Sequence, residues 1–180
     1  MFVVRRLLRI SRTEAVALIV DCTEQPIRRP RHDAVQKAHH SGKKKRHTLK
    51  TEIIVTATGR IAAISASHPG SHHDLTIRCE DTPLPKRARL YADSAYQGYE
   101  PEHPNLGTPY KKPKGGELDE EERHYNRGLG SFCVVVEHRI GRMKRFRIAS
   151  DRFRNPRGTH GTKTPIIAGL VDMGAGFMPV

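Results

Sequence analysis

The chain has 180 residues, and its 32 lysines and arginines outnumber 19 acidic residues, which gives a formal net charge of +13. A chain of this length can form one domain with a substantial core. Positive charge of this size favours a polyanionic partner such as nucleic acid or an anionic membrane surface. The apolar run over 15–20 is far shorter than the roughly 20 residues that cross a bilayer, and basic residues interrupt the apolar start. The sequence therefore predicts no membrane insertion.

The three cysteines are Cys22, Cys79 and Cys133. Their odd number, wide separation and lack of a CxxC pair argue against a disulfide framework and against a cysteine zinc site. Free cysteines of this kind are typical of a reducing cytoplasm.

Three strands are predicted in the first part of the chain. The first, AVALIVD over 15–21, ends in an acid, and the other two span 49–57 and 61–66. A tight hairpin turn at 58–60 is expected to join the second and third strands. Between the first two strands, the charged run GKKKRH over 42–47 is predicted to be a hairpin tip or a mobile loop.

Helices and further strands are predicted to follow in the second part. In chain order they are a short helix over 71–80 with Ser71 as N-cap, a strand over 89–93, a short strand near 108–111, a helix over 118–148 and a helix over 165–170. The long helix begins with acids and ends with bases, as the helix dipole favours. Gly128 and Gly130 could divide it into two helices. The pattern predicts a mixed α/β fold.

Two of the predicted strands end in an aspartate, Asp21 and Asp93, and ligand sites collect at such strand ends. A third acid, Glu137, lies on the long helix. Three carboxylates make an oxygen-rich site suited to Mg²⁺ or Mn²⁺. Two such ions about 3.5–4 Å apart can support phosphodiester cleavage.

Glu137 borders the apolar stripe that Val136, Ile140 and Met143 would form on a helix. Lys144, seven residues later, falls within about 20° of Glu137 around the axis. The carboxylate could thus bind metal while the ammonium contacts a phosphate. The alternative is that each aspartate caps a turn and Glu137 pairs with a helix neighbour.

Five segments in order resemble one family: VDCTEQPI, HSGKKKRHTLKTEIIV, PGSHHDLTI, YADSAYQGY and VVVEHRIGRMKRFRI. The chain from about 18 to 170 is similar to the catalytic domain of bacterial insertion-sequence transposases, DDE superfamily endonucleases related to Harbinger elements. The resemblance implies a ribonuclease-H-like mixed sheet flanked by helices, spanning 15–172 between a short extension over 1–14 and a tail over 173–180. It also implies that Asp21, Asp93 and Glu137 are the metal-binding triad.

The resemblance further implies strand cleavage and strand transfer on double-stranded DNA, at terminal inverted repeats and target, with two Mg²⁺ or Mn²⁺ ions. The residues expected to contact DNA phosphates are Lys43, Lys44, Lys45, Arg46, Arg142, Lys144 and Arg145. Thr23, His73 and Asp74 are expected to support the metal ligands. Alone, His72, His73 and Asp74 would suggest zinc, but a helix cap or such support is favoured. Glu24 is expected to be a solvated turn acid or a further supporting group.

The sequence departs from the family pattern at three places near the triad. Cys22 replaces a glycine, Gly130 a serine, and Cys133 an arginine that would grip phosphate with two hydrogen bonds. Residues 1–14 are too few for a helix-turn-helix, so an upstream polypeptide is expected to supply it, and a homo-oligomer is expected to form on DNA in the bacterial nucleoid. The alternatives are a truncated DNA-binding remnant of a transposase and a plain ribonuclease-H-like nuclease.

Overall fold

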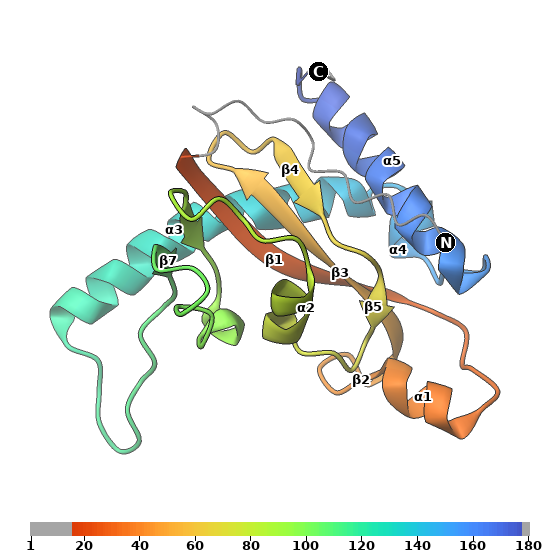
Figure 1. Cartoon of the computed structure of the whole chain (residues 1–180), viewed down its shortest axis with the longest axis horizontal. Coiled ribbons are helices and arrows are strands. Elements are labelled where there is room, and N and C mark those ends of the chain that lie inside the picture. The colour runs from red at the N-terminus through yellow and green to blue at the C-terminus, as the bar shows by residue number, and fades with distance from the viewer. Residues whose placement is uncertain (1–15, 178–180) are drawn as a thin grey trace.

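The computed structural model describes residues 16–177 (Figure 1). The elements in chain order are β1 Ala17–Pro26, α1 Asp33–His39, β2 His40–Ser41, β3 Arg46–Thr56, β4 Ile61–Ile64, β5 His68–Pro69, α2 Asp74–Glu80, β6 Arg89–Tyr91, η2 Ser94–Tyr96, β7 Leu106–Gly107, α3 Glu120–Lys144, α4 Arg147–Ser150, η3 Arg157–Thr159 and α5 His160–Met173. The predicted extension over 1–14 and the last three residues of the predicted tail lie outside the described residues.

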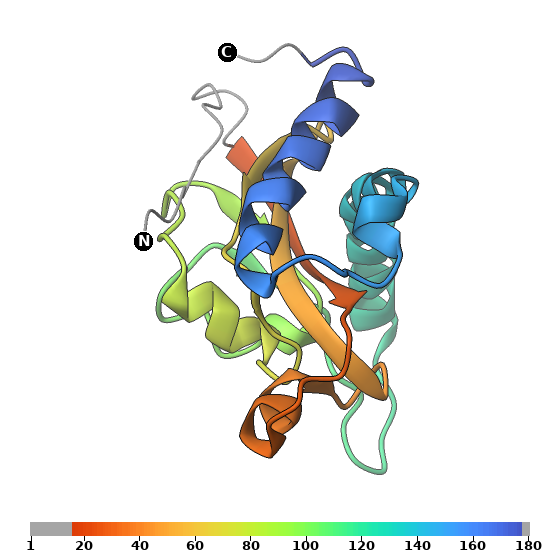
Figure 2. The ribbon, with the colours of Figure 1, turned by 90° about the vertical axis from the view of Figure 1, so that its right-hand side faces the viewer.

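One mixed sheet forms the centre of the molecule, with the strand order β2-β3-β1-β6-β7. β3 is antiparallel to β1 and also pairs with β4 and β5, whereas β6 is parallel to both β1 and β7. Figure 2 shows α3 and α5 on one face of the sheet and α2 on the other. The structure thus confirms a mixed α/β fold of the ribonuclease-H-like kind.

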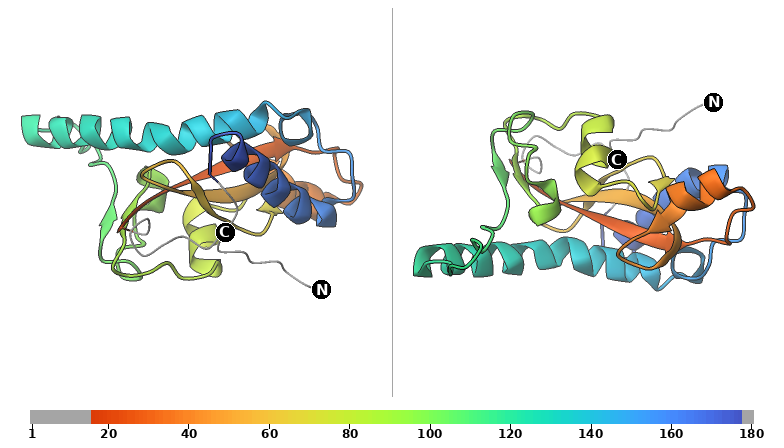
Figure 3. Two further views of the ribbon diagram at one scale, coloured as in Figure 1. Left: turned by 90° about the horizontal axis from the view of Figure 1, so that it is seen from above. Right: turned by 90° about the horizontal axis from the view of Figure 1, so that it is seen from below.

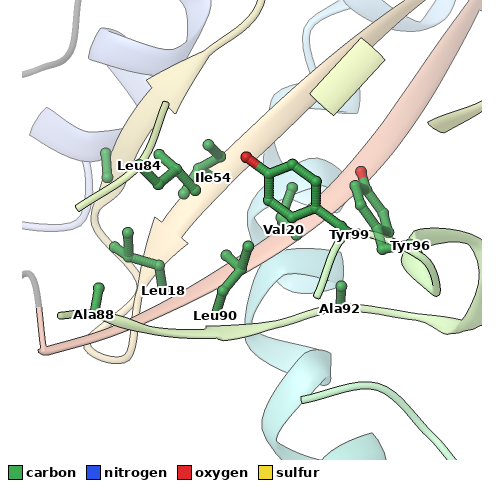
Figure 4. Packing of buried hydrophobic residues seen from close by; sticks show 10 residues of the cluster. Leu18, Val20, Ile54, Leu84, Ala88, Leu90, Ala92, Tyr96 and Tyr99 are labelled. Carbon is green, nitrogen blue, oxygen red and sulfur yellow. The ribbon is translucent and has the colours of Figure 1, made fainter. Parts of the chain in front are cut away.

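β1 is buried on both faces, which explains its continuous apolar run. Leu18 and Val20 belong to the core on the α2 side of the sheet, shown in Figure 4. Ile19 points the other way and packs with Ile140 in the core beneath α3 and α5. Because successive side chains of a strand alternate between faces, Asp21 lies on the α3 side with Ile19.

β1 does not end at Asp21, as the sequence predicted, but continues to Pro26. Its pairing with β3 runs without interruption from Leu18 to Pro26. Polar side chains in the added segment find partners, since the Gln25 amide donates to the carbonyls of Ile148 and Asp151. Pairing with β6, however, ends at Ile19, so the sheet opens beside Asp21.

The two predicted turns in the first half are confirmed. Residues 42–45 form the tip between β2 and β3, and the next hairpin joins β3 to β4 through residues 57–60. Gly59 adopts a φ of +86°, which side chains rarely allow. The helix α1, Asp33–His39, was not predicted from the sequence.

α3 is one uninterrupted helix despite Gly128 and Gly130. A capping box formed by Asp119 and Glu122 starts it, and buried residues including Leu129 hold it against neighbouring structure. Tertiary packing of this kind outweighs a glycine cost of about 1 kcal/mol each.

Other predicted boundaries shifted. The N-cap of α2 is His73 and not Ser71, whose hydroxyl instead donates to the Ala38 carbonyl. β7 lies two residues before the predicted strand at 108–111, and α5 extends well beyond the predicted 165–170 in both directions. Short elements such as these are fixed by contacts with distant parts of the chain more than by local pattern.

Candidate functional site

Asp21 lies on β1 where the sheet opens between β1 and β6. Its half-buried carboxylate accepts a hydrogen bond from the backbone N–H of Cys22 at 2.7 Å. Burial raises the pKa of Asp21 to about 6, and the nearby charges of Asp93 and Asp74 raise it further, against the lowering effect of the Cys22 N–H. This carboxyl group is therefore electrostatically strained when ionised.

Asp93 follows β6 by two residues. The parallel pairing of Ile19 with Tyr91 places Asp21 and Asp93 at equivalent positions, each two residues further along its chain segment. Asp93 caps η2, with Oδ1 accepting from the backbone N–H of Ala95 at 2.8 Å. Asp93 thus has the expected capping role, which uses one of its two carboxylate oxygens. The side chain is exposed, so the second oxygen is available to a further ligand.

Glu137 projects from α3, which Val136, Ile140 and Met143 anchor to the sheet as predicted. Among the described residues Glu137 makes no hydrogen bond or ion pair, so the alternative of a pairing with a helix neighbour does not occur. Its carboxylate remains exposed and available to a ligand.

Cys133, one turn before Glu137, connects the three acids in space. Burial raises the pKa of its thiol to about 11, and the charges of Asp21, Asp93 and Glu137 each raise it further. The three carboxylates thus lie within electrostatic range of the thiol, because such effects weaken with distance. Two adjacent strands and α3 bring these acids around one half-buried cysteine.

The donor set fits a divalent cation. None of the three carboxylates forms an ion pair with a lysine or arginine in the described part of the chain, and burial raises the pKa of Asp21 although the charge of Lys43 lowers it. Oxygen ligands of this kind suit Mg²⁺ or Mn²⁺. The carboxylate oxygens of Asp21, Asp93 and Glu137 do not all lie within 4.8 Å of one another. Within residues 16–177, one other set of three potential ligands meets that spacing. The metal-binding role of the triad stays a prediction.

Basic groups lie beside this acidic site. The pKa of Lys144 is lowered by burial and by the charge of Lys44, whereas Asp21 and Glu24 oppose that change. Lys43 in turn lowers the pKa of Asp21. The tip between β2 and β3 is thus near both Lys144 and the first carboxylate. The predicted phosphate contacts at this end of the site are exposed: Lys43, Lys44, Lys45, Arg46, Arg142, Lys144 and Arg145.

Lys50 on β3 contacts the predicted supporting residue Asp74, and the sequence analysis did not identify it. Its ammonium donates to the Asp74 carboxylate at 2.8 Å and to the His72 carbonyl at 2.8 Å, and lies 3.9 Å from the Glu24 carboxylate. Glu24 also accepts from the Thr48 hydroxyl and sits in mid-strand, so it is not a solvated turn acid. Only the β1–β3 register, which pairs Glu24 with Lys50, reveals this arrangement.

The other predicted supporting residues differ in their surroundings. Asp74 acts on Asp21 through its charge, and His73 caps α2 by accepting from the backbone N–H of Leu75. Thr23 lines a cavity of about 20 Å³ beside Lys144, and its buried hydroxyl has no partner among the described residues. Their support of metal ligands remains a prediction.

The fold and the convergence of acids define a ribonuclease-H-like domain with a candidate carboxylate site. Residues 20–171 match the family model described as DDE superfamily endonuclease, and the chain belongs to this family.

The chain is also 35% identical over 156 residues to the probable transposase for insertion sequence element IS702 of Microchaete diplosiphon. That alignment covers 86% of this chain and 56% of the relative, so the chain spans little more than half of the relative's length. The resemblance predicted from the five segments is confirmed.

No solved structure matches the chain significantly. Within the described residues, no helix combines the length and apolar character that crossing a membrane requires.

Proposed function

We propose that this chain is the catalytic part of a transposase, which cleaves DNA strands at element ends and joins them to a target. The observation that carries the proposal is the placement of Asp21 and Asp93 two residues beyond the paired Ile19 and Tyr91, at the sheet face on which α3 with Glu137 packs. Family membership and the similarity to a probable transposase support the same function.

In this proposal the three carboxylates hold two Mg²⁺ or Mn²⁺ ions. Bound ions of this kind activate the attacking oxygen and offset charge on the leaving 3′-oxygen. Asp21 contributes a carboxylate whose ionised form is costly without a cation, since burial raises its pKa to about 6. Asp93 is held by the cap of η2, and Glu137 by the packing of α3.

The DNA backbone is proposed to run from Lys144 toward the tip over 42–45. Lys144 lies close enough to Asp21 for the two charges to interact, so a phosphate held by its ammonium would be near the carboxylates. Lysines and arginines neutralise phosphates without regard to sequence. Recognition of inverted repeats is therefore assigned to an upstream helix-turn-helix polypeptide, and pairing of element ends to a homo-oligomer at the nucleoid.

Cys133 favours a second candidate, a DNA-binding remnant with impaired catalysis. Its thiol, with a pKa of about 11, is uncharged at neutral pH and cannot supply the two parallel hydrogen bonds of an arginine to phosphate. In that case the basic surface would still bind DNA, while cleavage would be lost.

A nicking and strand-transfer assay on inverted-repeat DNA tests the first candidate against the second. Metal-dependent nicks and joined products are expected from the chain, together with an upstream helix-turn-helix polypeptide if one is required. Glu137→Gln should abolish both products and retain DNA binding. Glu121→Gln is a matched control, because Glu121 is an exposed acid in the first turn of the same helix.

Binding without any nick in Mg²⁺ or Mn²⁺ would establish the remnant and overturn the enzyme. Nicks without joined products would indicate a plain nuclease. Equal activity of Glu137→Gln and the unmodified chain would remove Glu137 from the site.

A further inference from the structure

A second group of metal-ligating side chains lies away from the triad. It consists of His68 on β5, His72 in the following turn and Glu80 at the end of α2. One ligand atom from each lies within 4.8 Å of the other two, and no other such set of three occurs in residues 16–177. The sequence analysis weighed zinc only at His72, His73 and Asp74, and it identified neither His68 nor Glu80 as a ligand.

The separations are close to those that a bound ion needs. His68 Nδ1 lies 3.7 Å from Glu80 Oε2, and the two imidazole rings have centroids 5.7 Å apart. Ligands about 2.0–2.1 Å from a tetrahedral zinc ion lie roughly 3.4 Å from one another. Because every pair lies within 4.8 Å, contraction by at most about 1.4 Å would complete a three-ligand site.

The hydrogen bonding of the cluster also leaves a place for an ion. The Nδ1 atom of His72 is buried and makes no hydrogen bond within the described structure. His68 Nδ1 lies 3.7 Å from Glu80 Oε2, which is beyond hydrogen-bond distance, so this ring nitrogen also has no hydrogen-bond partner within the described structure. A neutral imidazole keeps a lone pair for a metal.

We propose that His68, His72 and Glu80 bind one Zn²⁺ ion that joins β5 and the following turn to α2. Two imidazoles and one carboxylate suit zinc, whereas the all-carboxylate triad suits Mg²⁺ or Mn²⁺. Glu80 has a side-chain exposure of 53%, so the proposed site is open to water, which would supply the fourth ligand.

This ion would act on the catalytic region through the backbone of His72. The carbonyl of His72 accepts from Lys50, which also pairs with Asp74, and the charge of Asp74 acts on Asp21. Zinc would fix the turn that carries His72 and thereby hold Lys50 and Asp74 in place. The proposed site is independent of whether the triad cleaves DNA.

Calorimetric titration of ZnCl₂ into the EDTA-treated chain, in excess Mg²⁺, tests this site. One equivalent is expected to bind, and Co²⁺ should give the visible absorption of a tetrahedral complex. His72→Ala and Glu80→Gln should each weaken Zn²⁺ binding by at least about tenfold, because even the loss of a group that only supports a ligand costs about 10–100-fold. His124→Ala, at an exposed position of α3, should leave binding unchanged.

Absence of Zn²⁺ binding, or unchanged binding in Glu80→Gln, would overturn the proposal. So would loss of Zn²⁺ binding in Glu137→Gln, because the ion would then occupy the triad. Circular dichroism of the EDTA-treated variants shows whether each is folded, and the exposed, isosteric Glu80→Gln change keeps the test decisive even if His72→Ala unfolds.

Discussion

Burial of the Asp21 carboxyl group disfavours its ionised form at the candidate site. Its folded-state pKa of about 6 exceeds the ordinary value of 3.8, chiefly because the carboxyl group is buried. Above pH 6 the folded state holds a poorly solvated charge that the unfolded state solvates freely. Between about pH 6 and 4 the folded state takes up a proton first, so this group makes folding more favourable as the pH falls.

Asp21→Asn should therefore stabilise the metal-free protein at pH 7.5 by on the order of 1–2 kcal/mol. The gain should shrink toward pH 4, where the native carboxyl group is already neutral. Urea denaturation of both proteins in EDTA measures the difference, with Asp33→Asn in the exposed first turn of α1 as control. A destabilised Asp21→Asn at pH 7.5 would show that the carboxylate is compensated in the folded state.

At the scale of elements, α3 is stabilised by its N-terminal capping box and its buried face, and two glycines weaken its interior. Its capping box and its buried stripe stabilise the helix, whereas Gly128 and Gly130 lie in its interior. A Cβ added at either glycine would meet no atom within 4 Å. The two glycines therefore relieve no crowding in the folded helix. They increase the conformational entropy of the unfolded chain and so lower the stability of the folded state.

Gly128→Ala and Gly130→Ala should each raise the free energy of unfolding by about 0.5–1 kcal/mol. Thermal and urea unfolding measure the effect. Gly59→Ala should act in the opposite direction, because Gly59 has a φ of +86° and its added Cβ would lie 2.8 Å from an Arg139 nitrogen. No change from the two helix substitutions would mean that α3 is not continuous in solution.

At the scale of the whole molecule, the net charge of +13 is spread over several surfaces, and only some of them adjoin the triad. The tip over 42–45, which carries Lys43, Lys44 and Lys45, interacts electrostatically with Asp21 and Lys144. A second lysine group, Lys111, Lys112 and Lys114, lies in the loop that precedes α3. Each of the two groups has three lysines. Replacing one group or the other therefore removes the same charge from a different place, which shows whether DNA binding depends on location or on net charge.

Replacing Lys43, Lys44 and Lys45 by glutamine should weaken DNA binding and reduce the slope of log K against log salt by up to about 3, near 0.9 per lost phosphate contact. The same replacement at Lys111, Lys112 and Lys114 should change the slope less. Fluorescence anisotropy over a range of salt concentrations gives both slopes. Equal slopes for the two variants would assign binding to overall charge alone.

Local patterns predicted the elements with strong periodicity or length. The apolar run of β1 and the stripe of Val136, Ile140 and Met143 were identified from the sequence, because burial on defined faces imposes a period. Contacts that depend on the register between strands were not identified from the sequence. The partnership of Lys50 with Glu24 arises from the β1–β3 alignment, and His68 meets Glu80 only after β5 pairs with β3.

α3 separates charge along its length. Its 25 residues extend about 37 Å, and Figure 3 shows its first part projecting beyond the sheet. Glu120, Glu121 and Glu122 occupy that projecting end, whereas Arg142 and Lys144 occupy the end beside the carboxylate site. In the field of a polyanion such a helix feels a torque that turns the basic end inward and the acidic end outward. The molecule would thus be aligned during its approach, before any base is contacted.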